Sequence, residues 1–434
     1  MARGAGAARR SVTMSAPTDA ATARRAVAAV WRIESAKIVA TVTRLVGDFG
    51  LAEDLAQEAL VDALRQWPID GVPRNGAAWL TSVARRKAID GWRRRERLDE
   101  RIAVIAHDLE REQDEAADAL PWDPDAIDDD VLRLIFISCH PELSREAQVA
   151  LTLRVVAGLS TEEIARAFLV PIATVQQRIV RAKKTLAAAN VPFELPPRDE
   201  HAQRVGAVLG VLYLIFNEGH AASSGPDWMR PELSIEAIRL ARVLVALMPR
   251  ECDAHSLLAL MELTAARFPA RVDANGDPVL LADQDRSRCE RSRIARGRAA
   301  LAAADALGTG RGAYGLQAAI AECHAVAASV EETDWDRIVV LYEALSRIAP
   351  SPVVELNRAA AVAMATGPAS ALRIIDALVE SGSLRGYHLL PATRGELLRR
   401  PGRDDEARSE FTTAAALAGN ERERALLQAK AAGR

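Results

Sequence analysis

The chain has 434 residues, a formal net charge of −3, and aromatic residues at only 4% of positions. A single hydrophobic core stops growing at about 250–300 residues, so this length predicts two or three domains. Alanine, leucine and arginine dominate and lose little side-chain freedom in helices, which predicts an all-α protein and argues against a sheet protein.

The four cysteines lie far apart without a C-x-x-C pair, so the spacing indicates neither a disulfide framework nor a thiolate zinc site. We expect no metal and no cofactor. No stretch approaches about 18 uninterrupted apolar residues, and the first 25 residues lack a signal-peptide core. We therefore expect a cytoplasmic protein that does not enter a membrane, with residues 1–25 disordered and Met14 as an alternative start.

Charge is distributed in blocks. Residues 85–97 carry seven Arg or Lys, whereas residues 99–130 carry thirteen Asp or Glu. Adjacent blocks of opposite sign predict separate surfaces with separate partners.

Residues 26–97 form the first predicted unit, in which apolar residues recur at helical spacing. Gly47 and Gly50 are predicted helix stops, and "WPIDGVPRNG" (67–76) is a predicted loop. The helix that follows carries tryptophans and a row of arginines. Such a face fits phosphate contacts and the stacking of unpaired bases, although a charged, solvated helix is the competing interpretation.

Residues 98–130 form a predicted acidic linker, and residues 131–190 form a second unit with a helix-turn-helix pattern. Ser160 and Glu163 make a predicted capping box, "FLVP" makes the turn, and the second helix opens at Pro171. Its polar face could enter a major groove, although it could also be a solvated surface. The residues predicted to be exposed there are Thr174, Gln176, Gln177, Arg178, Arg181 and Lys184.

Three prolines in "NVPFELPPRD" (190–199) mark a predicted domain boundary, after which residues 200–434 are predicted to be helical. Two segments near the end repeat with a period of about 34–36 residues, which is typical of tetratricopeptide-type helix pairs. The repeat aligns Leu356 with Leu390 and Ile375 with Phe411.

The stretch "LYLIFNEGH" (212–220) ends an apolar helix in residue types that could transfer protons. The simpler hypothesis is a helix that stops at Gly219, with Asn217 and Glu218 bonded to the following loop. The alternative is an enzyme with its chemistry at Asn217, Glu218, Gly219 and His220. Asp227 and Asp334, each followed by tryptophan, are predicted helix caps.

Three segments in order resemble the extracytoplasmic-function (ECF) group of bacterial RNA polymerase sigma factors. They are "AEDLAQEALVDALRQW" (52–67), "AWLTSVARRKAIDGWRRR" (78–95) and "LSREAQVALTLRVVAGLSTEEIARAFLVPIATVQQRIVRAKKTL" (143–186). The resemblance implies that residues 26–97 are sigma region 2 and residues 131–190 are sigma region 4. It also implies a transcription initiation factor that is not an enzyme.

The resemblance implies roles for individual residues. Contacts with core RNA polymerase would come from Asp54, Gln57, Glu58 and Leu60, where Leu60 replaces a usual aromatic. Asn75 and Trp79 would hold a flipped base of promoter DNA. Phosphate contacts would come from the basic residues Arg85, Arg86, Lys87, Arg93 and Arg94.

The acidic linker would thread the basic channel of the polymerase. The C-terminal half resembles a tetratricopeptide-like helical extension of one class of these factors, which implies that residues 200–434 regulate the sigma module. A regulatory protein, or the sigma module itself, would then dock on the extension.

Overall fold

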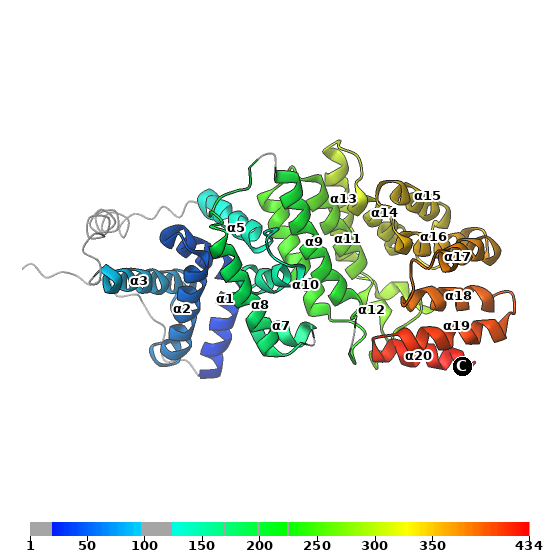
Figure 1. Ribbon diagram of the computed structural model, residues 1–434, viewed down its shortest axis with the longest axis horizontal. Coiled ribbons are helices and arrows are strands. Elements are labelled where there is room, and N and C mark those ends of the chain that lie inside the picture. Colours follow the sequence, from blue (N-terminus) through cyan, green and yellow to red (C-terminus); the bar gives the residue numbers. More distant parts are fainter. Residues whose placement is uncertain (1–19, 97–123, 169, 198–199, 224, 434) are drawn as a thin grey trace, which may run out of the picture. The chain divides into compact units, whose positions relative to one another are not determined.

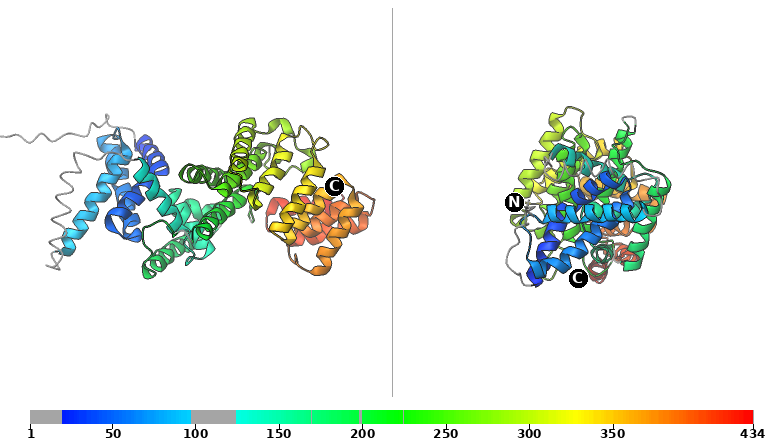
Figure 2. Two further views of the ribbon diagram at one scale, coloured as in Figure 1. Left: turned by 90° about the horizontal axis from the view of Figure 1, so that it is seen from above. Right: turned by 90° about the vertical axis from the view of Figure 1, so that its left-hand side faces the viewer.

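The computed structural model describes residues 20–96, 124–168, 170–197, 200–223 and 225–433, and the regular structure among them is helical without a β-strand (Figures 1 and 2). The all-α prediction is therefore confirmed. Residues 98–123 of the predicted linker and residues 1–19 of the predicted disordered terminus lie outside the described residues.

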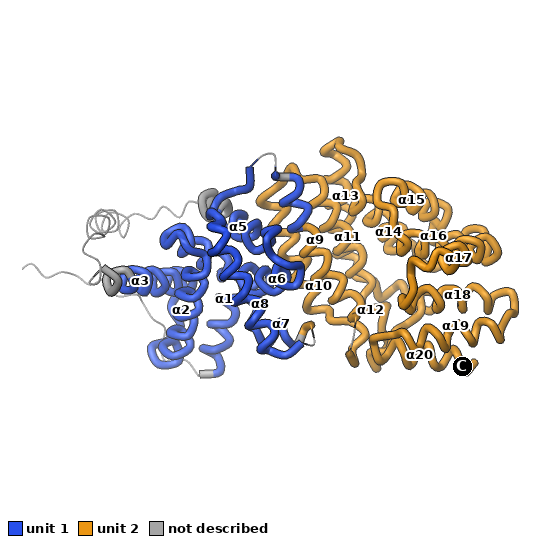
Figure 3. The backbone as a smooth tube through the Cα atoms, in the orientation of Figure 1, with its two compact units in different colours: residues 1–166, 170–208 blue, residues 167–169, 209–434 orange. Residues whose placement is uncertain are grey.

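The chain divides into two compact units (Figure 3). The first comprises residues 1–166 and 170–208, and the second comprises residues 167–169 and 209–434. Each unit has its own apolar core. Trp67, Phe136 and Ile38 are fully buried in the first unit, and Phe216 and Phe411 are fully buried in the second.

The first unit is built around α1, which packs against α2, α3 and α5. Its α-helices are α1 (Ala20–Val46), α2 (Phe49–Asp70), α3 (Gly76–Glu96), α5 (Pro124–Ser138), α6 (Arg145–Leu151), α7 (Thr161–Phe168) and α8 (Ile172–Ala188). A π-helix, Thr152–Val156, continues α6.

Three boundaries differ from the sequence prediction. Helix α1 begins at Ala20, within the segment predicted to be disordered, because Ala23 is already buried. Helix α2 begins before Gly50 and continues through Pro68, because Trp67 is fully buried and holds this end of the helix against the core. Helix α5 begins at Pro124, inside the predicted linker.

The second unit is a succession of helices, most of which pack against a neighbour in the chain (Figures 1 and 2). They are α9 (His201–His220), which starts in the first unit, α10 (Pro231–Leu247), α11 (Cys252–Ala265), α12 (Phe268–Arg271), α13 (Arg291–Ala306), α14 (Ala313–Val326), α15 (Trp335–Ile348), α16 (Pro352–Ala365), α17 (Pro368–Ser381), α18 (Leu389–Arg399), α19 (Asp404–Leu417) and α20 (Glu421–Ala431). Two short 3-10 helices, Leu281–Asp283 and Arg286–Arg288, precede α13.

The four residues aligned by the sequence repeat occupy four consecutive helices. Leu356 lies on α16 and Leu390 on α18, whereas Ile375 lies on α17 and Phe411 on α19. All four are buried. The helices of each aligned pair therefore present equivalent positions to the core.

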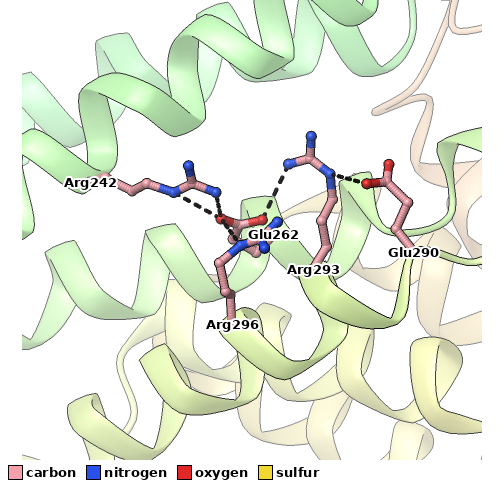
Figure 4. Close-up of polar contacts among 5 residues, drawn as sticks. All are labelled: Arg242, Glu262, Glu290, Arg293 and Arg296. Atoms are coloured by element: carbon pink, nitrogen blue, oxygen red, sulfur yellow. Dashed lines mark hydrogen bonds and ion pairs between the residues drawn. The ribbon is translucent and has the colours of Figure 1, made fainter.

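A buried carboxylate joins three helices at the start of the second unit (Figure 4). Glu262 of α11 accepts hydrogen bonds from Arg242 Nε at 3.0 Å, Arg293 Nη1 at 3.2 Å and Arg296 Nε at 3.3 Å. Arg293 also donates to Glu290 at 3.1 Å. A buried charge is tolerated when it is paired and hydrogen-bonded, and Glu262 satisfies both conditions.

Candidate nucleic-acid interface

Three of the predicted polymerase-binding residues, Asp54, Gln57 and Glu58, share one side of α2, and Leu60 lies farther around the helix. Asp54 and Glu58 are exposed, whereas Gln57 and Leu60 are half-buried. The start of the helix is fixed by Asp48, whose carboxylate accepts a hydrogen bond from the Leu51 backbone at 2.9 Å. Residues four apart lie on one helix face, so Asp54 and Glu58 form an acidic stripe that a partner can reach.

Lys87 of α3 is bound to this stripe. Its ammonium group lies 3.1 Å from Glu58 and 3.0 Å from Asp62. Burial opposes the charge, but hydrogen bonds to Asp62 and Glu58 outweigh it and raise the pKa of Lys87. A residue predicted to contact DNA is thus joined to one predicted to contact the polymerase.

Asn75 and Trp79 lie at the start of α3, and both have structural contacts. Asn75 Oδ1 accepts a hydrogen bond from the Ala78 backbone at 3.0 Å, which caps the helix. The ring of Trp79 packs edge-on against Trp67, with centroids 5.7 Å apart and planes at 75°. Asn75 remains exposed and Trp79 half-buried, so both can still be approached from solvent.

The basic residues of α3 continue from this point. Arg86 is exposed and donates to the Ser82 carbonyl at 3.4 Å, and Arg85 is half-buried. Arg93 and Arg94 follow on the same helix, but their side chains lie outside the described residues.

The helix-turn-helix begins with the capping box that the sequence predicted. The Ser160 backbone donates to Glu163 Oε2 at 2.8 Å, and the Glu163 backbone donates to Ser160 Oγ at 3.1 Å. Ile164 and Ala165 are buried. The second helix, α8, starts at Ile172 with Pro171 as its N-cap, one residue later than predicted.

The outer face of α8 is polar and cationic, since Val175, Ile179, Ala182 and Leu186 face the core. Among the residues predicted to read DNA, Gln176, Gln177, Arg181 and Lys184 are exposed, whereas Thr174 and Arg178 are half-buried. The helix therefore presents hydrogen-bonding side chains to a partner along its length.

Helices α8 and α2 are joined by ion pairs. Lys183 Nζ lies 2.7 Å from Asp54 Oδ1 and also hydrogen-bonds Glu53. Arg154, on the π-helix, lies 3.3 Å from Glu53, whose side chain is only 4% exposed. The helix-turn-helix and the helical unit before it are thus packed together within the first compact unit.

Sequence reasoning missed Glu53, Arg154 and Lys183. Lys183 is 130 residues from Glu53 in the chain, so no local spacing connects them. Burial alone would lower the pKa of Lys183, but the two carboxylates outweigh burial and raise the pKa. The sequence predicted the caps of neighbouring helices. Those caps locate the helices along the chain but do not show which side chains pair between them.

The segment 217–220 is held by an ion pair and a close helix contact. Glu218 accepts a hydrogen bond from buried Arg230 and another from the Ser223 backbone at 3.3 Å, so the predicted bond to the loop is present for Glu218. The predicted stop at Gly219 is wrong, because α9 continues to His220. A Cβ atom at Gly219 would lie 2.4 Å from the Ser234 backbone nitrogen, so this glycine permits close packing of α9 and α10.

The two aspartate caps have different outcomes. Asp334 Oδ1 accepts a hydrogen bond from the Arg337 backbone at 3.0 Å and caps α15, as predicted. Asp227 caps no helix, because α10 begins four residues later, at Pro231, with Arg230 as its N-cap. Trp228 instead lines a cavity of the second unit.

Within the part of the chain that the structure describes, no group of three or more His, Cys, Asp or Glu residues could hold a metal ion. Nor does any described helix have both the length and the apolar character needed to cross a membrane.

Three known protein families match separate parts of the chain. Residues 33–98 match Sigma-70 region 2, and residues 133–186 match Sigma-70, region 4. Residues 204–305 match a family of unknown function, DUF6596. No solved structure matches the chain.

Three relatives illustrate the range of similarity. Uncharacterized protein R00370 of Rhizobium meliloti (strain 1021) is 45% identical over 388 residues, which cover 89% of this chain and 90% of that protein. The RNA polymerase sigma-H factor of Pseudomonas aeruginosa is 32% identical over 161 residues, which cover 36% of this chain and 82% of that protein. The probable ECF RNA polymerase sigma factor SigI of Mycobacterium tuberculosis is 29% identical over 173 residues, which cover 39% of this chain and 58% of that protein.

Most of a sigma-H factor therefore aligns with part of this chain, and the matches to the two sigma regions follow one another in the expected order, almost entirely within the first compact unit. The polar outer face of α8 and the acidic stripe of α2 lie within those regions. This chain belongs to the sigma-70 family of RNA polymerase sigma factors.

Proposed function

We propose that this chain is an ECF-type sigma factor that binds core RNA polymerase and directs initiation at specific promoters. The observation that carries the proposal is the presence of sigma regions 2 and 4 in one chain, each with an exposed polar helix face. Two of its relatives are named as RNA polymerase sigma factors, one of them as a probable ECF factor, which supports the proposal.

In region 2, the acidic stripe at Asp54 and Glu58, with Gln57 and Leu60 beside it, would bind the polymerase. Asn75 and Trp79 would hold an extruded base of the −10 element. Flipping costs a few kcal/mol, which stacking and hydrogen bonding at such a pocket can offset. The arginines of α3 would then neutralise phosphates.

In region 4, α8 would enter the major groove of the −35 element. Gln176 or Gln177 can pair with adenine and Arg181 with guanine, because each side chain offers two hydrogen bonds in the geometry of those bases. Lys184, on the same exposed face, would contact phosphate. Thr174 and Arg178, half-buried at its edge, would support these contacts.

We further propose that residues 200–434 are a tetratricopeptide-like extension that regulates the sigma module. The equivalent burial of Leu356 with Leu390, and of Ile375 with Phe411, supports a repeat. Helical repeats of this kind present extended binding surfaces. A regulatory protein or the sigma module would dock there, and the part of the acidic linker that precedes α5, residues 98–123, would thread the polymerase channel.

The alternative function, an enzyme with its chemistry at residues 217–220, finds less support. The Glu218 carboxylate is bound by Arg230, and His220 contacts the guanidinium of Arg271 instead of a carboxylate. Burial, then Arg271 and Arg267, hold the pKa of His220 well below its usual range, which makes it a poor general base.

Transcription with purified core polymerase tests the proposal. The full chain should support promoter-dependent initiation, and the Asp54→Ala, Gln57→Ala double variant should bind core polymerase more weakly. Gln66→Ala, an exposed position on the same helix, is the matched control. Absence of core binding by the unaltered chain would refute the sigma function.

A truncation tests the regulatory claim. It is best made after Val208, since this keeps Arg204, which donates to the Phe136 carbonyl at 3.2 Å inside the first unit. We expect promoter-dependent output to change by several-fold relative to the full chain. Equal output from both proteins at equal core occupancy would contradict regulation by the extension.

A further inference from the structure

The second unit contains an open cavity of about 1050 Å³. Helices α9, α11, α14, α15, α16 and the α17–α18 connection contribute to its wall, so it is built from segments spread over the whole unit. Small-molecule sites commonly span about 300–1,000 Å³, and this cavity is large enough for such a ligand with water. Asn217 and His220, from the segment that first suggested chemistry, both line it.

The cavity wall gathers a rare residue type. Tyr213, Tyr342 and Tyr387 line it, and these are three of the four tyrosines in the chain. The fourth, Tyr314, packs edge-on against Tyr213 at 5.6 Å. Burial first, and then Tyr213, raise the pKa of Tyr342 to about 12, so it remains a neutral phenol. Aromatic walls of this kind suit a planar or apolar molecular body.

Two arginines in the wall lack a carboxylate among the contacts of the described residues. Arg271 Nη1 donates to the His220 carbonyl at 2.8 Å and contacts His220 Nδ1 at 2.5 Å. Arg267 Nη2 donates to Gln284 Oε1 at 2.6 Å. These partners are neutral, whereas the arginines around Glu262 in Figure 4 share a buried carboxylate.

Burial and neighbouring positive charges lower the pKa values of both arginines. Burial and the neighbouring positive charge of Arg267 lower the pKa of Arg271 to about 9. Burial, then Arg286, lower the pKa of Arg267 to about 10. A positive charge out of water requires a counter-charge, and the one carboxylate in the cavity wall, Glu423, is bound to His388 at 3.0 Å.

Hydrogen-bond donors in the wall also lack acceptors. Trp228 Nε1 and Arg267 Nε are buried atoms without a hydrogen-bond partner among the described residues, and so is His324 Nδ1. Arg271 lies over the Trp228 ring at 5.7 Å, which places this indole beside the guanidinium. The wall therefore offers a ligand both positive charge and buried polar atoms that have no hydrogen-bond partner among the described residues.

We propose that this cavity is the binding site of a small organic anion, whose carboxylate or phosphate pairs with Arg267 and Arg271 while its planar body lies among the tyrosines. Guanidinium groups recognise both anions through paired hydrogen bonds. In the regulatory extension proposed above, this anion is the signal that the factor senses. That role depends on the proposed function, whereas the binding does not.

Calorimetric titration of the full-length chain tests the site, with phenyl phosphate and benzoate as anionic probes and benzyl alcohol as a neutral probe. We expect saturable binding of an anion below about 10 mM and no comparable binding of the alcohol. Stronger binding of phenyl phosphate identifies a phosphorylated ligand, and stronger binding of benzoate identifies a carboxylic acid.

Arg271→Met and Arg267→Met should each weaken binding at least tenfold. Arg373→Met, which removes an exposed arginine from α17 outside the cavity wall, should leave binding unchanged. Neither cavity variant should unfold the chain, because each removes a charge that has no carboxylate partner. Arg271→Lys is the second variant, since it keeps the charge and loses the paired geometry.

Absence of saturable binding of both anions, or binding that all these variants share equally, would overturn the site. The regulatory role is decided separately by adding the bound probe to the transcription assay. If the probe binds but does not change promoter-dependent transcription, and the truncation after Val208 does not change it either, the binding site stands and the proposed regulation is refuted.

Discussion

Lys183 Nζ of α8 lies 2.7 Å from Asp54 Oδ1 of α2, although the two residues are separated by 129 positions in the chain. Asp54 is a proposed polymerase contact, and Lys183 belongs to the proposed DNA-reading helix. The same cation also binds the buried Glu53. The contact thus joins the two regions that a sigma factor uses on its two partners.

Lys183→Met should strengthen binding to core polymerase. In the unaltered chain, Asp54 must give up its ion pair with Lys183 when it binds the polymerase, whereas the variant has no such pair to break. Glu53 keeps Arg154 as its counter-charge. A partly exposed ion pair contributes about 1 kcal/mol, so we expect an affinity gain of about fivefold in a competition assay. Lys184→Met removes the same charge from an exposed neighbouring position and should leave core binding unchanged. Weaker binding by the Lys183 variant would contradict the role of Asp54.

The α8 residues should separate into two classes by their salt and sequence dependence. Arg181→Ala should reduce binding to a cognate promoter by about 1–3 kcal/mol and relax specificity at one base. Lys184→Ala should weaken binding to all sequences and reduce the salt slope by about 1. Titrations against cognate and shuffled −35 duplexes at several salt concentrations distinguish the two. Equal losses on both duplexes for Arg181→Ala would refute base recognition.

Two glycines of α9 should respond in opposite directions to alanine. Gly219→Ala should destabilise the chain by about 1–3 kcal/mol, because the new Cβ would lie 2.4 Å from the Ser234 backbone nitrogen and force α9 from α10. Gly206→Ala is the control, since nothing lies within 4 Å of that Cβ. It should stabilise the helix by about 0.5–1 kcal/mol. Chemical denaturation of both variants measures the difference, and a stable Gly219→Ala protein would disprove the close contact.

The cavity histidines should make stability fall in mild acid. Burial, followed by Arg267 and Arg286, lowers the pKa of His324 to about 3, below its unfolded value of 6.5. The unfolded chain therefore binds the extra proton between these values, and stability is lost as pH falls through 6.5 toward 3. The contribution is about 1 kcal/mol per pH unit. The unfolding midpoint of His324→Phe should decline less steeply between pH 6.5 and 4.5, and an unchanged slope would contradict the prediction.

Hydrogen bonds between residues close together in the sequence could be predicted from the sequence alone. The Ser160–Glu163 capping box and the Asp334 cap are each made within three positions, and both are present. The polar face of α8 also followed from spacing, as did the helical class.

Features that depend on distant parts of the chain were not predictable in this way. Glu53 and Lys183 meet across 130 positions, and the cavity draws on residues from Tyr213 to Glu423. Trp228 was expected beside a helix cap, but it lines the cavity. Gly219 was expected to end its helix, but it instead allows α9 to pack closely against α10. The local sequence does not indicate either outcome, because each depends on which helix or loop packs against the residue in the folded chain.

The cap at Asn75 limits which atom of a base this residue can meet. Its Oδ1 accepts a hydrogen bond from the Ala78 backbone at 3.0 Å, whereas its Nδ2 amide takes no part in the cap. In the proposed base-binding role, the Nδ2 amide would suit a base atom that offers a lone pair, such as a ring nitrogen or a carbonyl oxygen. Asn75→Asp keeps the oxygen that starts α3 and removes the donor, so promoter melting can be impaired while the helix remains intact.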